Sequence, residues 1–364
     1  MKRFLILFLL AILTGITAFA QSDLQPVAIV RLTRSDPITV KQLKTEVEKL
    51  AWRNLAMRFG RVPTTAELAR EVQNSNVEMR RQVLEALINE RLAIQAAERD
   101  RITVTDNEIN QEINRLKAQM AQTIGRQPTD DEFATAIKEE TGQDLPAFRD
   151  NIRRQAITQK YLMSKKQNLF NNIKEPTDAE IVNYYNLSRA QMVRPETVRF
   201  SMIQVPYGAD AASKTRAKEL ADRLNREINS NPSRFDEVVI RGQAPNSGFN
   251  AGDGGYLPRN MEAQQVAGAD FINTAFALRQ GEVSKVIEGL QGYQIIKITE
   301  SLPQKALELD EIMYPGRPGT VRQLIGANLL QQRQQEILAQ ATQELVTELR
   351  AGNSFQVMEN NLNW

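Results

Sequence analysis

The chain has 364 residues, of which 41% are hydrophobic and 25% are charged, a composition typical of a globular protein with two or three domains. It contains neither cysteine nor histidine. Disulfide bonds, thiol or imidazole catalysis and histidine-containing metal sites are therefore excluded. The formal charge is only +2, from 46 basic and 44 acidic side chains.

The first twenty residues, 1–20, have the pattern of a secretory signal peptide. Lys2 and Arg3 precede the apolar run from Phe4 to Leu13, and the stretch from Ala18 to Ala20 suits a cleavage site. An uncleaved anchor is the alternative, although the run is short for a bilayer span. Cleavage would leave 44 basic against 44 acidic side chains. We expect a secreted, soluble chain that binds no nucleic acid and is not stably inserted in a membrane.

Residues 21–190 carry the signals of a helical region. The β-branched run from Val27 to Val30 predicts one short strand, and apolar residues at helical spacing follow it. The longest helix is expected after Asn76. Capping boxes, in which a threonine is followed three residues later by Glu or Gln, predict six helix starts, the last beyond this region: Thr39/Gln42, Thr64/Glu67, Thr105/Glu108, Thr129/Glu132, Thr177/Glu180 and Thr320/Gln323.

Residues 196–302 read as a compact α+β domain. The expected elements, in chain order, are a strand from Val198 to Val205, a helix with Leu220, Leu224 and Ile228 on one face, a Gly/Asn-rich loop from Gly242 to Gly255, a helix from Phe271 to Leu278, and strands from Val283 to Ile287 and from Tyr293 to Ile298.

Residues 303–364 are expected to form a long amphipathic helix from Thr320 to Arg350. Gly352 should stop this helix, and Phe355 to Met358 should form a last short strand. The apolar stripe of the helix needs a partner, since an isolated helix of this kind is marginal in water. We predict that it packs on the N-terminal helical region as one folding unit. The alternative is a free-standing helix that dimerises with a second copy.

Three segments of the α+β domain resemble the parvulin family of peptidyl-prolyl isomerases. Gly252 to Tyr256 resembles the family's Gly-Gly-Asp-Leu-Gly-aromatic loop, the segment Phe271 to Ser284 its helix and turn, and Gly292 to Lys297 its last strand. The flanks are similar to the SurA and PrsA type of folding factor, on the stretch Gln82 to Leu92 and the segment Ile102 to Asp106. The resemblance implies an α+β multidomain chain, in which a helical SurA-like N-terminal/C-terminal chaperone core carries an inserted parvulin-like (FKBP-like) domain.

The sequence departs from the parvulin pattern at the cleft. Met202 and Gln294 stand where the family has two histidines, and Gly254 stands where it has an apolar leucine. The family's Cys or Asp falls within Ala244 to Asn246, where neither residue is found. Phe271 is interpreted equally well as cleft or core, and core is the better interpretation for Phe276. We assign no catalytic residue, and the resemblance places the cleft at Met202, Asp253, Tyr256, Phe271, Phe276 and Gln294.

The resemblance implies a periplasmic chaperone for unfolded or nascent secreted or outer-membrane polypeptides, whose isomerase cleft is weakly active or inactive. A working prolyl isomerase is the alternative, because isomerisation needs only preferential binding of the twisted amide. A degenerate docking module in an envelope assembly is the third hypothesis. We find no Gly-rich phosphate loop and no cluster with metal-ligand spacing, and we expect no cofactor and no metal.

Overall fold

A computed structural model describes residues 23–208, 210–231, 233–244, 246–289 and 291–364. The predicted signal peptide, residues 1–20, lies outside the described residues. The described chain divides into two compact units, one built from residues 23–173 with 334–364 and the other from residues 174–333. We name these the helical unit and the sheet unit and describe each by itself.

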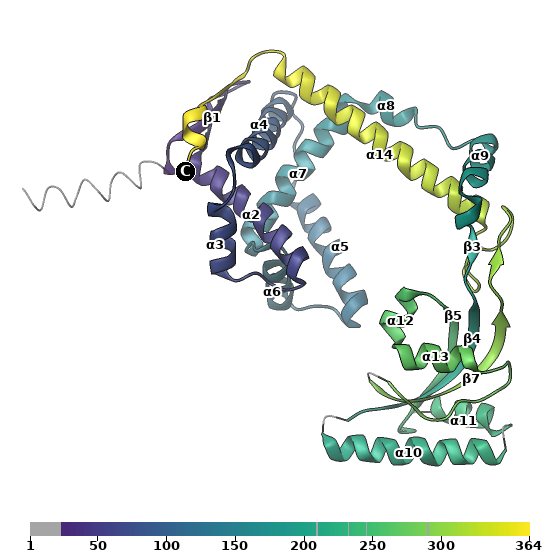
Figure 1. Ribbon diagram of the computed structural model, residues 1–364. Helices are drawn as coiled ribbons and strands as arrows, with labels where there is room; N and C mark the ends of the chain where they lie inside the picture. The colour runs from purple at the N-terminus through teal and green to yellow at the C-terminus, as the bar shows by residue number, and fades with distance from the viewer. Residues whose placement is uncertain (1–22, 209, 232, 245, 290) are drawn as a thin grey trace, which may run out of the picture. The chain divides into compact units, whose positions relative to one another are not determined.

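The helical unit combines a small three-stranded sheet with a set of helices (Figure 1). Its elements are β1 (Pro26–Val30), β2 (Asp36–Thr39), α2 (Val40–Phe59), α3 (Thr65–Gln73), α4 (Val77–Arg99), α5 (Asp106–Ile124), α6 (Asp130–Thr141), α7 (Leu145–Lys165), α8 (Gln167–Asn171), the later part of α14 (Val321–Arg350), β9 (Phe355–Val357) and a final 3-10 turn (Glu359–Leu362).

The predicted capping boxes are all present. Five open α2, α3, α5, α6 and α9 (Asp178–Ser188). The sixth precedes α14, where the Thr320 N–H donates to Gln323 Oε1 at 3.0 Å and the Gln323 N–H donates to Thr320 Oγ1 at 3.3 Å. The sequence could predict these boxes because their hydrogen bonds join residues within one turn of helix. They do not depend on tertiary contacts.

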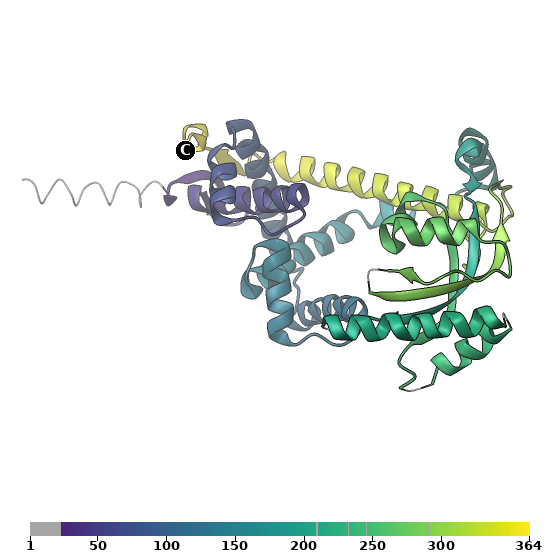
Figure 2. The ribbon, with the colours of Figure 1, turned by 60° about the horizontal axis from the view of Figure 1, so that its bottom comes forward.

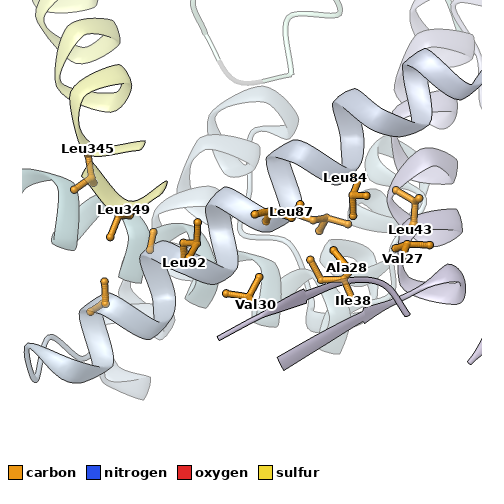
Figure 3. Packing of buried hydrophobic residues seen from close by; sticks show 14 of the residues in the cluster. Val27, Ala28, Val30, Ile38, Leu43, Leu84, Leu87, Leu92, Leu345 and Leu349 are labelled. Carbon is orange, nitrogen blue, oxygen red and sulfur yellow. The ribbon is translucent and has the colours of Figure 1, made fainter. Parts of the chain in front are cut away.

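The core of the helical unit joins both ends of the chain. Figure 3 shows α4 side chains facing β1 and β2, with Leu345 and Leu349 of α14 approaching the same cluster. β9 pairs antiparallel with β1, so that Val357 lies opposite Ala28. The buried members contributed by the C-terminal segment are Ala341, Leu345, Leu349 and Leu362.

Polar contacts fix the C-terminal segment to the same core. The Lys166 side chain is only 9% exposed, and its Nζ lies 3.0 Å from Glu344 and 2.7 Å from Glu348. Arg350 Nε donates to Asn89 Oδ1 at 2.7 Å, and the buried Arg80 donates to the Leu362 carbonyl at 2.9 Å. Residues 334–364 are therefore part of the fold of this unit.

The sheet unit is built on an antiparallel sheet in the order β5-β4-β7-β6. Helices α10 and α11 cover one face and α12 and α13 the other (Figures 1 and 2). Besides α9 and the start of α14, its elements are a 3-10 turn (Arg189–Gln191), β3 (Val193–Arg194), β4 (Thr197–Pro206), α10 (Ala211–Ser230), α11 (Arg234–Gly242), β5 (Asn250–Pro258), α12 (Met261–Ala267), α13 (Ala269–Ala277), β6 (Ile287–Glu288), β7 (Gly292–Leu302) and β8 (Lys305–Ala306).

Several sequence predictions need correction. The longest helix among the described residues is α14 with 30 residues, not α4 with 23, because the α14 stripe continues through both units. The left-handed residue after α14 is Asn353 (φ 49°) rather than Gly352. Half of the expected loop from Gly242 to Gly255 is instead the end of α11 at Gly242 or the part of strand β5 that begins at Asn250, since pairing with β4 overrides its Gly/Asn composition.

Two further boundaries differ. The expected strand from Val283 to Ile287 is reduced to β6, with an isolated bridge between Val283 and Lys297. Residues 174–190, expected in the helical region, lie in the sheet unit. There Tyr185 is buried beside Leu307, and its hydroxyl donates to the Leu307 carbonyl at 3.0 Å.

The capping glutamates predict how stability depends on acid. Hydrogen bonds from Arg61 to Glu67, from the Thr105 N–H to Glu108 and from Arg126 to Glu132 lower each carboxyl pKa from 4.5 to about 2. A lowered folded-state pKa gives stability that is complete above pH 4.5 and is lost as the pH falls towards 2. We expect the melting temperature of the helical unit to fall over that range.

The triple variant Glu67→Gln, Glu108→Gln, Glu132→Gln keeps the capping geometry and removes the titration. Its melting temperature should change less over the same range, and carboxyl carbon NMR shifts of the unsubstituted chain should report the three pKa values directly. Titration of these three carboxyls near pH 4.5 would contradict the assignment.

Candidate functional sites: a cleft and a groove

The first candidate site is a cleft of about 330 Å³ on the face of the sheet that α12 and α13 cover. It is lined by Phe200, Met202, Gln204, Leu257, Val266, Ala267, Phe271, Gln291 and Gln294. Strand pairing places Gln204 directly opposite Gln294 and Met202 opposite Ile296. Met202 and Gln294, which stand where the family has two histidines, are therefore diagonal neighbours on one face of the sheet.

The floor of the cleft is aromatic. The rings of Phe200 and Phe271 meet edge to face, with centroids 5.4 Å apart and an interplanar angle of 70°. Phe271 is 4% exposed and belongs to the buried cluster of the sheet unit, so it serves both the cleft and the core. Phe276 packs against the same cluster but does not line the cleft among the described residues.

Gly254, which stands where the family has a leucine, leaves no empty space beside the cleft. A Cβ added at Gly254 would overlap the ring of Phe200, which occupies the space that a side chain there would need. The wall is therefore supplied by Phe200 from the neighbouring strand. This substitution of one apolar group for another was not visible in the motif, because it depends on how β4 and β5 pair.

Asp253 and Tyr256 belong to the opposite face of the sheet. Asp253 accepts a hydrogen bond from Arg199 at 2.5 Å, which lowers its pKa, and another from the Gly255 N–H at 2.9 Å. The Tyr256 hydroxyl donates to Glu300 at 2.7 Å, and this bond raises its pKa. Their partners are structural, and neither residue lines the cleft in the part of the chain that the structure describes.

The cleft offers amides and apolar surface but no charge. Among the described residues, none of its lining side chains is ionisable, and its polar groups are the three glutamines. Gln294 Oε1 is buried and has no hydrogen-bond partner in the described structure. The cleft can therefore bind an uncharged group, but general acid–base chemistry would need a titratable side chain that it lacks.

The second candidate site is a groove of about 840 Å³ within the helical unit. Its apolar lining is Ala93, Leu116, Phe148, Ile152, Leu162, Leu338, Leu345, Val346 and Leu349. Its charged lining is three acidic and three basic side chains, a net charge of zero: Glu46, Glu90, Glu112, Lys49, Arg53 and Arg154. Two of these pairs are bonded to each other, Lys49 to Glu46 at 2.6 Å and Arg154 to Glu90 at 2.8 Å.

The groove also carries polar groups that bind no other described side chain. The α7 amides Asn151, Gln155 and Gln159 line it at intervals of four residues, and Gln143 Oε1 is buried without a hydrogen-bond partner in the described structure. The lining of this groove could not be predicted residue by residue from the sequence, because several helices distant in sequence build it. The one available signal was the apolar stripe of α14, from which Leu338 remains 47% exposed.

Each of the two units contains a match to a known protein family. The PPIC-type PPIASE domain matches residues 176–313, and the SurA-like N-terminal domain matches residues 1–162. The chain therefore combines a SurA-like N-terminal domain with a PPIC-type PPIase domain, a combination similar to that of SurA/PrsA-type folding factors. The predicted fold class, a helical SurA-like part with a parvulin-like α+β domain, is confirmed.

Individual relatives are distant. The chaperone SurA of Chromohalobacter salexigens is 24% identical over 98% of this chain and 75% of its own length. The foldase PrsA of Clostridium botulinum is 23% identical over 78% of this chain and 75% of its own length. The SurA of Nitrosococcus oceani is 26% identical over 61% of this chain, and the match spans 49% of that relative.

A solved structure described as one of two SurA-like chaperones of Campylobacter jejuni is 13% identical, with a TM-score of 0.39, and covers 92% of this chain and 100% of its own. Within the described residues, no helix is long and apolar enough to cross a membrane.

Proposed function

We propose that this chain is a periplasmic chaperone for unfolded or nascent secreted and outer-membrane polypeptides, and that its isomerase cleft is weakly active or inactive. The observation that carries the proposal is the neutral, largely apolar groove of the helical unit. Because unfolded chains expose apolar side chains that folding would bury, together with uncharged backbone, such a surface suits varied clients. The signal-like residues 1–20 support export to the periplasm.

Weak catalysis follows from the composition of the cleft. The barrier to rotation about an X-Pro bond is about 18–20 kcal/mol, and an enzyme lowers it only by binding the twisted amide better than the planar one. Phe200 and Phe271 supply an apolar seat, which favours the alternative of a working isomerase. Met202 and Gln294, however, provide neither a charge nor a rigid donor network where the family has its histidines.

A prolyl-peptide assay on the full chain tests this proposal. We expect a rate at least about tenfold below that of an ordinary parvulin, equivalent to ~1.4 kcal/mol of barrier. Any residual rate should be constant between about pH 5 and 9, because no described residue that lines the cleft ionises there. A rate within tenfold of an ordinary parvulin, or a bell-shaped pH profile, would favour the working enzyme.

A further inference from the structure

The charged side chains that line the groove of the helical unit are equal in number for each sign, but they do not all pair with one another. Two of the acidic side chains bond to the lining cations Lys49 and Arg154. The third, Glu112, accepts a hydrogen bond from Nε of Arg115 at 2.8 Å, and Arg115 lies outside the lining. Among the described residues, Arg53 is therefore the one charged side chain of the lining that has no bonded partner.

Arg53 stands where the groove adjoins a second pocket of the helical unit. It is an exposed residue of α2, and it lines both the groove and a pocket of about 340 Å³. The two cavities adjoin, since they share the lining residues Glu46, Arg53 and Glu90. The apolar lining of the pocket is Leu50, Met79, Val83, Ala86 and Leu87. A ligand that reaches the guanidinium can thus contact apolar surface in the groove and in the pocket.

An unpaired arginine at this place favours an anionic ligand. Its planar guanidinium presents a fork of N–H donors that fits a carboxylate, and it is more weakly hydrated than the ammonium of lysine. Less hydration is therefore lost when apolar groups cover it. Under the proposed function the occupants of the groove are unfolded polypeptides, whose anionic groups are the side chains of Asp and Glu and the C-terminal carboxylate.

We propose that Arg53 is a specificity-determining residue, which selects client segments that carry a carboxylate next to apolar side chains. The carboxylate pairs with the guanidinium, and the neighbouring apolar side chains enter the groove and the adjoining pocket. The inference rests on the proposed function and deepens it, because it names the kind of segment that the groove prefers. Since Arg53 is exposed, the preference should be modest and should weaken with salt.

The test measures peptide binding to the full chain at low ionic strength. The first pair of probes is acetyl-Ser-Phe-Glu-Phe-Ser-amide and the same peptide with Gln in place of Glu. Dissociation constants are obtained from NMR shifts of the methyl groups of Leu338, which lines the groove. We expect the carboxylate peptide to bind about three- to fivefold more tightly than the neutral one, the size typical of an exposed ion pair. The difference should shrink at about 0.5 M NaCl.

A second pair of probes separates the two sources of a carboxylate. Acetyl-Ser-Phe-Gln-Phe is used once with a free C-terminal carboxylate and once as its amide. A preference for Glu over Gln assigns Arg53 to acidic side chains, and a preference for the free acid over the amide assigns it to chain ends. Either preference supports the proposal, and equal affinity within both pairs would overturn it.

Two variants test whether Arg53 is the source of the preference. Arg53→Gln removes the charge and keeps a polar side chain, so it should bind both members of each pair with the affinity that the unsubstituted chain has for the neutral peptides. Arg58→Gln is the matched control and should keep the preference, because Arg58 is exposed on the same helix but lines neither cavity. A preference that persists in Arg53→Gln, or that both variants lose equally, contradicts the assignment.

Failure of this inference is distinguishable from failure of the proposed function. Equal binding of charged and neutral peptides, with Leu338 shifted by both, removes only the role of Arg53. If none of the four peptides shifts Leu338, the inference is also overturned. The proposed function is then judged by aggregation suppression, which does not depend on these peptides.

Discussion

Ending the chain at Arg333 should leave the helical unit unable to fold cooperatively. The truncation removes Leu345, Leu349 and Leu362, which are buried in the same cluster as β1 and α4. Each such side chain contributes about 1.5–3 kcal/mol when buried. Three of them approach the ~5–15 kcal/mol net stability of a whole domain, and the truncation also leaves Lys166 without its carboxylate partners.

Tryptophan fluorescence can follow the unfolding of the helical unit separately from that of the sheet unit. The chain has two tryptophans, and truncation removes Trp364, so that the remaining signal reports on Trp52 of the helical unit alone. We expect a broad, non-cooperative thermal change that becomes cooperative again when residues 334–364 are added as a peptide. A truncated chain that melts sharply at the temperature of the intact one would show that the helical unit does not need its C-terminal segment.

Replacing Gly254 by alanine adds only one methyl group, but it should destabilise the sheet unit strongly. The added Cβ would overlap the Phe200 ring, which is held in turn by Phe271. Forced repacking of this kind costs about 1–3 kcal/mol. Native-state hydrogen exchange of the β4 amides should show faster opening in Gly254→Ala.

Gly252→Ala is the matched control, since it lies in the same strand with no atom within 4 Å of an added Cβ. Its effect should stay within about 1 kcal/mol. Adding Phe200→Leu to Gly254→Ala should recover part of the lost protection. Equal exchange rates in Gly254→Ala and Gly252→Ala would show that the ring of Phe200 yields freely.

The sequence predicted most reliably those features that depend on neighbouring residues. Each capping box was found because its threonine and its Glu or Gln bond to the same turn of helix. The apolar stripe of α14 likewise indicated a buried face, and Leu345 and Leu349 are buried. The partners of that stripe needed the structure, because periodicity shows that a face is covered but not what covers it.

The faces of the cleft strands could not be predicted from the motif. The β4–β5 register shifts between Phe200 and Ser201, so Ser201 lies opposite Asp253 while Phe200 lies opposite Gly255. A shift of one residue sends side chains to the other face of a sheet. Asp253 and Tyr256 consequently lie beside Arg199, away from the cleft, although they belong to the segment that carries the family resemblance.

We propose that the groove of the helical unit holds unfolded clients, and aggregation suppression by two leucine variants is the sharpest test of this proposal. Leu338 lines the groove and is 47% exposed, whereas Leu187, in α9 of the sheet unit, is 82% exposed and does not line it. Each leucine is replaced by glutamate, and each variant is mixed at neutral pH with a membrane β-barrel protein diluted from urea.

A charge in the groove must be desolvated when an apolar client binds, so Leu338→Glu should lose most of the suppression that the unsubstituted chain provides. Leu187→Glu, the same change at a more exposed position, should keep it. If Leu338→Glu suppresses aggregation as well as Leu187→Glu does, clients do not bind in the groove.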